Sequence, residues 1–286
     1  MRRRWLLSAL VLVVVAFAVA RDGWADESGK TAAAGLGHGV VDPDSARIVY
    51  RGTERLRYTI SYTGGIKLGE LEMQVRPLAG VKPLFEISVV VTTADSIFDV
   101  IYPVRDIHLT RVAGAARLPG SYEAWLREGY NYRAHRRTEY DQQAGVIRNW
   151  KNDKPSTTYQ VSGVVHNEFS AFLWSRIMEF SPATSFLVPT FADKRRSEVE
   201  VRVLSRVRLK NTVFGAVETF MVSPVLPFRG LYDKRGPTTL WYTDDECRVP
   251  VQVRSELKIG SVTAALTAYD NPLCRRYGKD RKGGRQ

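Results

Sequence analysis

The sequence predicts an all-β protein whose antiparallel sheet curls into a barrel, a half-barrel or a β-spiral, together with one amphipathic helix. Three observations predict this fold. Apolar and polar residues alternate along most of the chain, glycine-containing turns separate several of the alternating segments, and only one segment carries apolar residues at helical spacing. We expect about twelve strands, and so many short strands in one chain form extended antiparallel sheets that curl.

The alternation begins at Arg47 and continues into a second segment after the Gly64-Gly65 turn. In the first segment the apolar side chains share one face: Leu56, Tyr58, Ile60 and Tyr62. In the second segment the apolar residues change parity, from Ile66 and Leu68 to Leu71, Met73 and Val75. Gly69 lies at the change, and we expect a β-bulge there.

Later segments repeat the alternation. The apolar sets are Phe85, Ile87, Val89 and Val91, then Tyr122, Ala124 and Leu126, then Val199, Val201, Val203, Val207 and Leu209. A last pair of runs, 249–257 and 262–268, flanks Gly260-Ser261. Gly-Ser between two alternating runs predicts a hairpin.

One segment changes from strand to helical spacing. Asn167 is a candidate N-cap and Ser181-Pro182 a stop signal, which predicts a helix of about thirteen residues. Its apolar face contains Phe169, Phe172, Leu173, Ile177 and Phe180, whereas Glu168, Ser175, Arg176 and Glu179 face elsewhere. The helix either plugs the open face of the curled sheet or forms a mobile lid over a ligand cavity.

The beginning of the chain has the order of a secretory signal peptide. The basic start Met1–Arg4 precedes an uncharged run to Ala20, and cleavage sites follow at Ala20 and Ala25. We favour cleavage after Ala25 and a periplasmic, exported, soluble protein that could lie peripherally on a membrane. The apolar run is shorter than the roughly 20 residues of a membrane-spanning helix, so we expect no transmembrane helix after cleavage. Export also argues against a nucleic-acid partner.

Four segments follow from this pattern. Residues 1–25 are the signal peptide, 26–46 a flexible lead-in poor in large apolar side chains, 47–275 a single β domain, and 276–286 a basic disordered tail. The formal net charge of +12 falls to +9 when Arg2, Arg3, Arg4, Arg21 and Asp22 are removed. A positive envelope protein is attracted to anionic lipid, lipopolysaccharide or acidic proteins, although such a charge also simply favours solubility.

The two cysteines, Cys247 and Cys274, lie near the end of the chain. In an oxidising compartment an isolated pair without metal-ligand or redox spacing predicts a disulfide.

Catalytic and metal-binding motifs are not found in the sequence, and the four histidines are scattered. We therefore assign no catalytic residue, no metal site and no cofactor. Arg202, Arg206 and Arg208 share one strand face and are candidates for docking an anionic group. Arg133, His135 and Arg137 likewise share a parity with Glu139. Such faces are more often simply the solvated side of a sheet.

Motifs at both ends of the β domain resemble those of the domain-of-unknown-function family 3108. At the start they are Gly52-x-Glu54-x-Leu56-x-Tyr58, Gly64-Gly65 and Leu68-Gly69; at the end they are Leu240-Trp-Tyr-Thr-Asp244, Arg248-Val-Pro250-Val and Leu257-x-Ile-Gly260-Ser. The resemblance covers residues 47–269. It implies an exported bacterial envelope protein with an all-β fold, and it brings no catalytic residue.

These observations favour a non-catalytic periplasmic envelope protein that binds an amphipathic ligand, such as a lipid or lipopolysaccharide, or an envelope protein. The alternative is an envelope hydrolase acting on glycan or lipid, which would require a cleft with converging carboxylates or a perturbed Ser or His. A third hypothesis is an assembly factor that uses a basic face against lipid.

Overall fold

The computed structural model describes residues 36–80, 83–152, 154–192, 194–225, 237–257 and 259–277. The predicted signal peptide, the first part of the lead-in and the last nine residues of the predicted tail lie outside these ranges.

The described strands form one antiparallel sheet of 14 strands built from two meanders, which confirms the predicted fold class. The first meander contains β1 (Glu54–Tyr62), β2 (Ile66–Leu78), β3 (Leu84–Thr92), β4 (Arg105–Ala113), β5 (Leu118–Glu128), β6 (Tyr132–Asp141), β7 (Val146–Lys151) and β8 (Thr157–Gln160). The second contains β9 (Thr184–Ala192), β10 (Arg195–Thr212), β11 (Gly215–Val225), β12 (Thr238–Thr243), β13 (Pro250–Glu256) and β14 (Ser261–Asp270). The pairing of β1 with β14 joins the two meanders.

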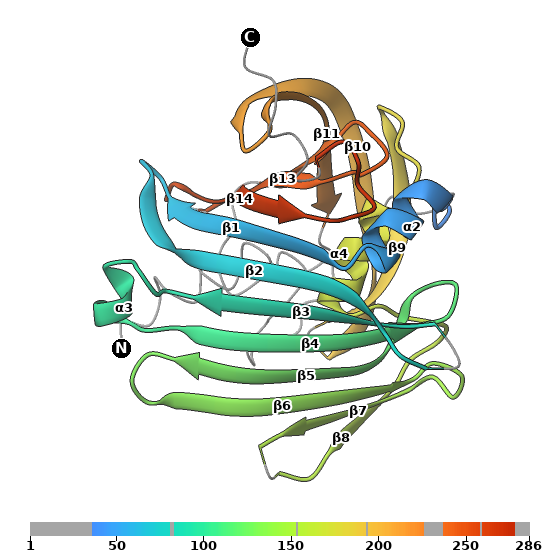
Figure 1. The fold of residues 1–286 in the computed structure, drawn as a ribbon. Coiled ribbons are helices and arrows are strands. Elements are labelled where there is room, and N and C mark those ends of the chain that lie inside the picture. Colours follow the sequence, from blue (N-terminus) through green and yellow to red (C-terminus); the bar gives the residue numbers. More distant parts are fainter. Residues whose placement is uncertain are drawn as a thin grey trace.

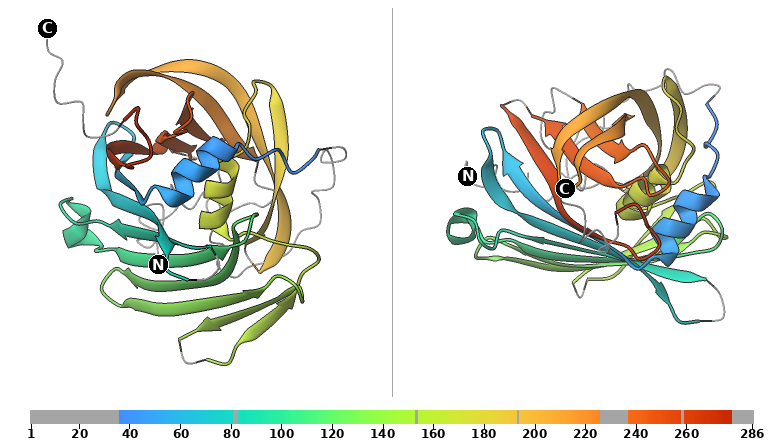
Figure 2. Two further views of the ribbon diagram at one scale, coloured as in Figure 1. Left: turned by 45° about the vertical axis from the view of Figure 1, so that its right-hand side comes forward. Right: turned by 45° about the horizontal axis from the view of Figure 1, so that its top comes forward.

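The sheet curls but does not close (Figure 1). Its two edge strands, β8 and β9, approach each other near Tyr159 and Phe191, whose ring centroids are 5.4 Å apart. The segment before helix α4 (Glu168–Arg176) also forms a parallel bridge from His166 to Thr190 of β9. Helix α4 lies between the two halves of the sheet (Figure 2). The fold is therefore a half-barrel with a helix on its concave side.

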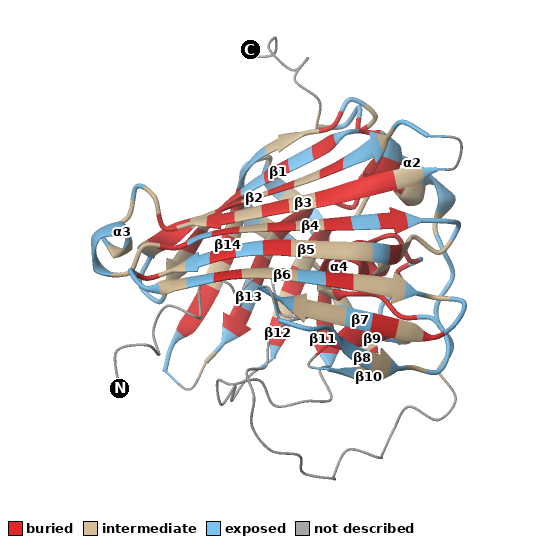
Figure 3. Cartoon of the chain, turned by 90° about the horizontal axis from the view of Figure 1, so that it is seen from below, coloured by how far each residue is buried: buried red, intermediate tan, exposed pale blue. Residues whose placement is uncertain are grey.

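The predicted alternation is visible as alternating buried and exposed positions along the strands (Figure 3). In β10, for example, Val199, Val201 and Val203 are buried. The bulge at Gly69 is confirmed, because the register with β1 moves from Ile60–Gly69 to Ser61–Lys67. The hairpin at Gly260-Ser261 is confirmed by the pairing of β13 with β14.

The lead-in prediction is wrong at its last four residues, 43–46, and the strand alternation predicted from Arg47 is wrong as far as Arg51. Residues 43–51 form helix α2 (Pro43–Arg51), whose first turn is capped by the Asp42 side chain. Three consecutive residues of this helix, Ile48, Val49 and Tyr50, are fully buried. The backbone before it is also bonded, since Asp42 N–H donates to Ile177 O at 2.8 Å. Its small polar residues therefore form a capped helix start instead of a flexible link.

Helix α4 is shorter than predicted and is not amphipathic. It ends at Arg176, and Ile177 occupies the C-cap. Ser175 and Arg176, which we placed on a polar face, are buried. The prediction fails because the helix is enclosed by the sheet, so its polar side chains are satisfied within the protein and not by water.

Arg176 and Glu54 form an ion pair in which neither side chain is exposed. The guanidinium donates to the Glu54 carboxylate at 2.5 and 2.8 Å. It also donates to the carbonyl oxygens of Arg248 at 2.6 Å and Cys247 at 2.8 Å. Burial alone would lower the pKa of Arg176, but the Glu54 carboxylate raises it above its usual value. This pair connects β1, α4 and the turn before β13.

The predicted disulfide is confirmed: Cys247 and Cys274 are bonded, with their Cα atoms 5.6 Å apart. The prediction of a disordered tail from residue 276 is wrong at its first two positions. The Tyr277 ring stacks on Phe214 at a centroid distance of 3.9 Å. Its hydroxyl donates to Asp245 at 2.6 Å, which connects Tyr277 to the turn that precedes Cys247.

Candidate functional site

The three arginines predicted to dock an anion, Arg202, Arg206 and Arg208, are already paired with carboxylates. Their partners are Glu200 at 2.8 Å, Asp244 at 2.8 Å and Glu218 at 3.1 Å, respectively. Because a cross-strand or same-face carboxylate balances each charge, this face has little free positive charge to offer a ligand.

The residues of the predicted plug or lid lie in the main hydrophobic core. Phe169, Phe172, Leu173 and Ile177 are between 0% and 6% exposed. The Phe172 ring lies 6.3 Å from that of Tyr242 on β12, and Phe169 contacts His108 on β4 at a centroid distance of 5.1 Å. These four side chains are therefore part of the core, and the choice between plug and lid stays a prediction.

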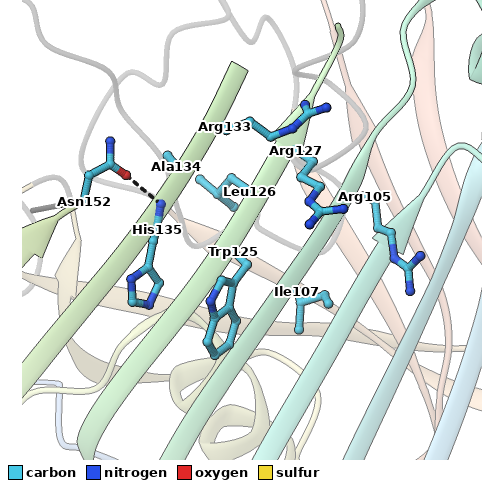
Figure 4. A pocket seen from close by; sticks show the side chains of 9 residues that line it. All are labelled: Arg105, Ile107, Trp125, Leu126, Arg127, Arg133, Ala134, His135 and Asn152. Carbon is cyan, nitrogen blue, oxygen red and sulfur yellow. Dashed lines mark hydrogen bonds between the residues drawn. The ribbon is translucent and has the colours of Figure 1, made fainter. Parts of the chain in front are cut away.

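A hollow lies on the outer face of β4–β6, opposite to the face that α4 covers (Figure 4). Its lining residues are Arg105, Ile107, Trp125, Leu126, Arg127, Arg133, Ala134, His135 and Asn152. The strand registers arrange the outward side chains in two rows, because Trp125 pairs with both Ile107 and His135, and Arg127 pairs with Arg133. We call them the aromatic row (Ile107, Trp125, His135) and the arginine row (Arg105, Arg127, Arg133).

The arginine row concentrates unbalanced positive charge. Arg127 and Arg133 are direct cross-strand partners. The register that pairs Val104 with Glu128 and Ile107 with Trp125 places Arg105 opposite Arg127. Like charges directly opposite each other destabilise a sheet. None of the three forms an ion pair with a described residue, and Arg133 donates only to the carbonyl oxygens of Gly129 and Tyr132. An anion bound here would relieve this repulsion.

The aromatic row presents an apolar surface beside this charge. The Trp125 ring stacks on His135 with a centroid distance of 5.3 Å and an interplanar angle of 17°. His135 Nε2 also lies 2.7 Å from Glu123 Oε1, which holds the imidazole in place. Trp125 remains 38% exposed. A second hollow adjoins the first, where the Arg137 guanidinium lies 4.4 Å from the centre of the Trp150 ring.

Asn152 supports the aromatic row from the end of β7. Its backbone has a φ of 53°, a left-handed conformation that Asn tolerates better than most residues. In this conformation its side-chain Oδ1 accepts from His135 N–H at 2.8 Å and its own N–H donates to His135 O at 2.7 Å. Both backbone groups of His135 are therefore satisfied at the edge of the hollow.

A different polar cluster lies on the inner face of the same strands. Asp106, His108 and Arg136 each have a side-chain atom without a hydrogen-bond partner in the described part of the structure. Burial raises the pKa of Asp106 and that of Glu168, at the start of α4, to about 7. Burial also lowers the pKa of His108 to about 3, so its imidazole is neutral at pH 7.

Two members of the inner cluster, Asp106 and His108, are buried, whereas Arg136 and Glu168 are partly exposed. Asp106 is 0% and His108 is 3% exposed. Asp106 Oδ1 accepts from Arg127 N–H at 2.9 Å, and the Tyr122 hydroxyl lies 2.9 Å from His108 Nδ1. Groups with such shifted pKa values can act as acids and bases, but a substrate would need an opening to reach them.

Sequence reasoning identified part of the outer site and missed the rest. The shared parity of Arg133, His135 and Arg137 pointed to this face. Arg105 and Arg127 were missed because each stands alone in its own strand, and only the register brings them beside Arg133. The sequence did contain one signal of this site. Trp125 alternates with the apolar Ala124 and Leu126, so a large aromatic residue occupies a position on the outward face of the strand.

Within the described ranges, no group of three or more His, Cys, Asp or Glu side chains is arranged to hold a metal ion. The described helices also include none with the length and apolar character needed to cross a bilayer.

The family model for a protein of unknown function, DUF3108, matches residues 57–267. The chain belongs to the DUF3108 family. The match begins after Gly52, Glu54 and Leu56 of the first motif and covers the other sequence motifs at both ends of the domain. No curated protein sequence matches the chain.

Solved structures resemble this DUF3108 protein in fold. The beta-barrel-like protein of the domain of unknown function DUF1849 from Brucella abortus has a TM-score of 0.50 and 7% identity, and the match covers 78% of this chain and 99% of that one. The hypothetical protein CT021 from Chlamydia trachomatis matches with a TM-score of 0.36 and 7% identity over 82% of this chain and 95% of its own. At this identity the first likeness shows a common β architecture alone, and the second carries no further argument.

Proposed function

We propose that this DUF3108 protein is a non-catalytic protein of the bacterial periplasm that binds an amphipathic, anionic molecule of the envelope at the outer hollow. The observation that carries the proposal is the arginine row: three exposed arginines that form no ion pair with a carboxylate in the described part of the chain, aligned beside the exposed Trp125. Arginine binds phosphate and carboxylate groups through paired N–H donors.

The aromatic row supplies the apolar half of such a site. A ligand whose anionic group lies on Arg127 and Arg133 would place its adjoining apolar part over Trp125 and Ile107. Amphipathic rings and aliphatic side chains beside a few charged groups are typical of ligand sites. Export is supported by the signal-peptide pattern of the first 25 residues.

The test uses protein purified from its own periplasm and lysophosphatidylglycerol, a single-chain amphiphile with one phosphate, below its critical micelle concentration. Isothermal titration calorimetry should show binding to the natural protein and at least about a tenfold loss for R127Q/R133Q, because each lost charge-assisted hydrogen bond is worth about 1.5–3 kcal/mol. The matched control is R202Q/R208Q, which removes two paired arginines from another face. Equal affinity of R127Q/R133Q and the natural protein would refute this site.

Native mass spectrometry of the same preparation, followed by organic extraction, would identify a natural ligand. A co-purifying lipid or glycan that is lost from R127Q/R133Q would support the proposal directly.

The second candidate function, an envelope hydrolase acting on glycan or lipid, is favoured by the raised pKa values of Asp106 and Glu168. It requires access to the inner cluster. Hydrolysis of fluorogenic glycoside or ester substrates that disappears in Asp106→Asn, with an unchanged melting temperature, would favour this function over binding alone.

A further inference from the structure

Large apolar side chains are exposed at one end of the half-barrel. They belong to four separate connections: the β1–β2 turn, helix α3 (Phe98–Ile101) with the residue before it, the β5–β6 turn and the β13–β14 turn. We call this set the apolar rim: Ile66, Ile97, Val100, Ile101, Tyr130 and Ile259. Val100 is 76% and Ile259 is 79% exposed, so these side chains add nothing to the core.

Antiparallel pairing places these connections at the same end of the sheet, as Figure 1 shows for α3 and the β1–β2 turn. Tyr62 pairs with both Ile66 of β2 and Val262 of β14, which brings the turns at Ile66 and Ile259 together. The Tyr62 hydroxyl also donates to Ile259 O at 2.7 Å.

Hydrogen bonds connect the remaining members of the apolar rim. Ser96 Oγ, just before α3, donates to Leu68 O at 3.0 Å, which links the α3 segment to the start of β2. The Tyr130 hydroxyl donates to Val100 O, and Gly129 N–H donates to Pro103 O at 2.8 Å. Gly129 has a φ of 60°, and a Cβ there would lie 2.8 Å from the Tyr102 ring. The four connections therefore form one continuous edge that presents its apolar side chains outward.

The arginine row lies directly behind this edge. Arg105 begins β4 after the α3 connection, and Arg127 and Arg133 flank the β5–β6 turn that carries Tyr130. Two carboxylates, Asp95 and Asp99, lie in the α3 segment, where Asp99 accepts from Thr93 Oγ1 at 3.1 Å. The row exceeds them by one positive charge, and the chain without its predicted signal peptide carries +9.

We propose that the apolar rim docks on the surface of an anionic phospholipid bilayer. The aliphatic tips enter the boundary between headgroups and acyl chains, and the arginine row binds lipid phosphates. Exposed apolar side chains beside cations are the pattern of proteins that lie on membranes without crossing them. Apolar side chains on four separate connections suit a fluid bilayer, because each connection can insert its side chains independently of the others. This inference rests on the proposed function only in its use of the arginine row. It identifies the amphiphile bound there as a phospholipid of a bilayer.

The experiment is flotation of the exported protein with vesicles of phosphatidylethanolamine and phosphatidylglycerol, and with vesicles of phosphatidylcholine alone. The natural protein should float with the anionic vesicles at low salt and lose binding as salt increases. The rim variant I97S/V100S/I101S should lose at least about tenfold in partitioning, because each aliphatic side chain that enters the boundary contributes hydrophobic free energy. R127Q/R133Q should lose roughly fivefold for each charge removed, on anionic vesicles only.

The matched control is L204S/V213S, which removes two exposed apolar side chains that are 41% and 43% exposed and lie on β10 and the β10–β11 turn. It should float like the natural protein. Circular dichroism and thermal melting establish that every variant is folded, and since the rim side chains are exposed their removal should leave the melting temperature unchanged. Flotation of the rim variant equal to that of the natural protein would overturn the docking surface.

Titration with lysophosphatidylglycerol separates this inference from the proposed function. If the rim variant binds the single-chain amphiphile normally but no longer floats, both proposals stand. If the natural protein binds the amphiphile but does not float, the docking surface is wrong and the outer hollow stands. If it floats without binding the amphiphile, the outer hollow is wrong and the docking surface stands.

Discussion

Replacement of Arg176 by Met tests whether the buried ion pair organises the core. The substitution removes four hydrogen bonds donated by the guanidinium, two to Glu54 and two to the carbonyl oxygens of Cys247 and Arg248. Glu54 is 0% exposed and would retain only the Tyr269 hydroxyl at 2.9 Å and the Asn271 amide at 3.3 Å.

The expected cost is large because a carboxylate would be left buried without its counter-charge. Removing one partner of a buried pair costs about 3–5 kcal/mol. A domain of this kind is stable by about 5–15 kcal/mol in total. R176M should therefore lose between about a fifth and all of its free energy of unfolding. In E54Q/R176M the buried charge is absent, and the side chain at position 54 still accepts a hydrogen bond from Tyr269. The double variant should therefore lose about 1–3 kcal/mol less free energy of unfolding than the sum of the losses of E54Q and R176M.

The assay is equilibrium urea unfolding of the oxidised protein at pH 7, followed by tryptophan fluorescence, for the natural protein and the three variants. The dependence of the free energy on urea should stay the same, so that midpoints report stability. A cost below about 1 kcal/mol for R176M, or additive effects in the double variant, would refute the reasoning. Either result would mean that water or local rearrangement satisfies Glu54.

Three further results are expected from the structure. The variant C247S/C274S should lose roughly 3 kcal/mol of stability, because the bridge spans 27 residues, and an unchanged melting temperature would contradict this. The contribution of Asp106 to stability should fall as pH rises from about 4 to about 7, because burial raises its pKa to about 7 and the folded state binds its proton more tightly than the unfolded one. Buried His108 and His166, whose pKa values are lowered to about 3, act in the opposite direction, so the measured quantity is the difference between the natural protein and D106N. The stability of the natural protein relative to D106N should decrease across this pH range, and a difference that does not change with pH would disprove the prediction. Gly52→Ala should lower the melting temperature, since a Cβ there would lie 1.9 Å from the Asn271 side chain, and a neutral effect would show that this loop can move.

Strands and turns could be predicted because their signals are local. Alternation at Leu56, Tyr58 and Ile60 requires only that one face of a strand be buried. The parity change at Gly69 identified the bulge for the same reason. Helix α2 was missed, although Asp42 and Pro43 form a regular helix start, because its residues were divided between the predicted lead-in and the alternating segment expected from Arg47.

The outer site could be predicted only in part. Arg202, Arg206 and Arg208 looked like a basic face, yet each lies beside a carboxylate that the folded sheet provides. Arg105 and Arg127 looked isolated, yet the register aligns them with Arg133. Whether an arginine has a carboxylate beside it depends on residues outside its own alternating segment, so that segment alone does not reveal it.

The sequence by itself determined the export pattern, the curled antiparallel sheet, the bulge and the disulfide, because each follows from composition, periodicity or the presence of a single cysteine pair. Only the tertiary structure decided that Arg176 is buried against Glu54, that the arginine row forms no ion pair with a carboxylate among the described residues, and that the exposed apolar side chains of the rim form one edge. The physical reason is that charge pairing and burial depend on contacts between residues as far apart as Glu54 and Arg176, and these contacts exist only once the sheet has curled.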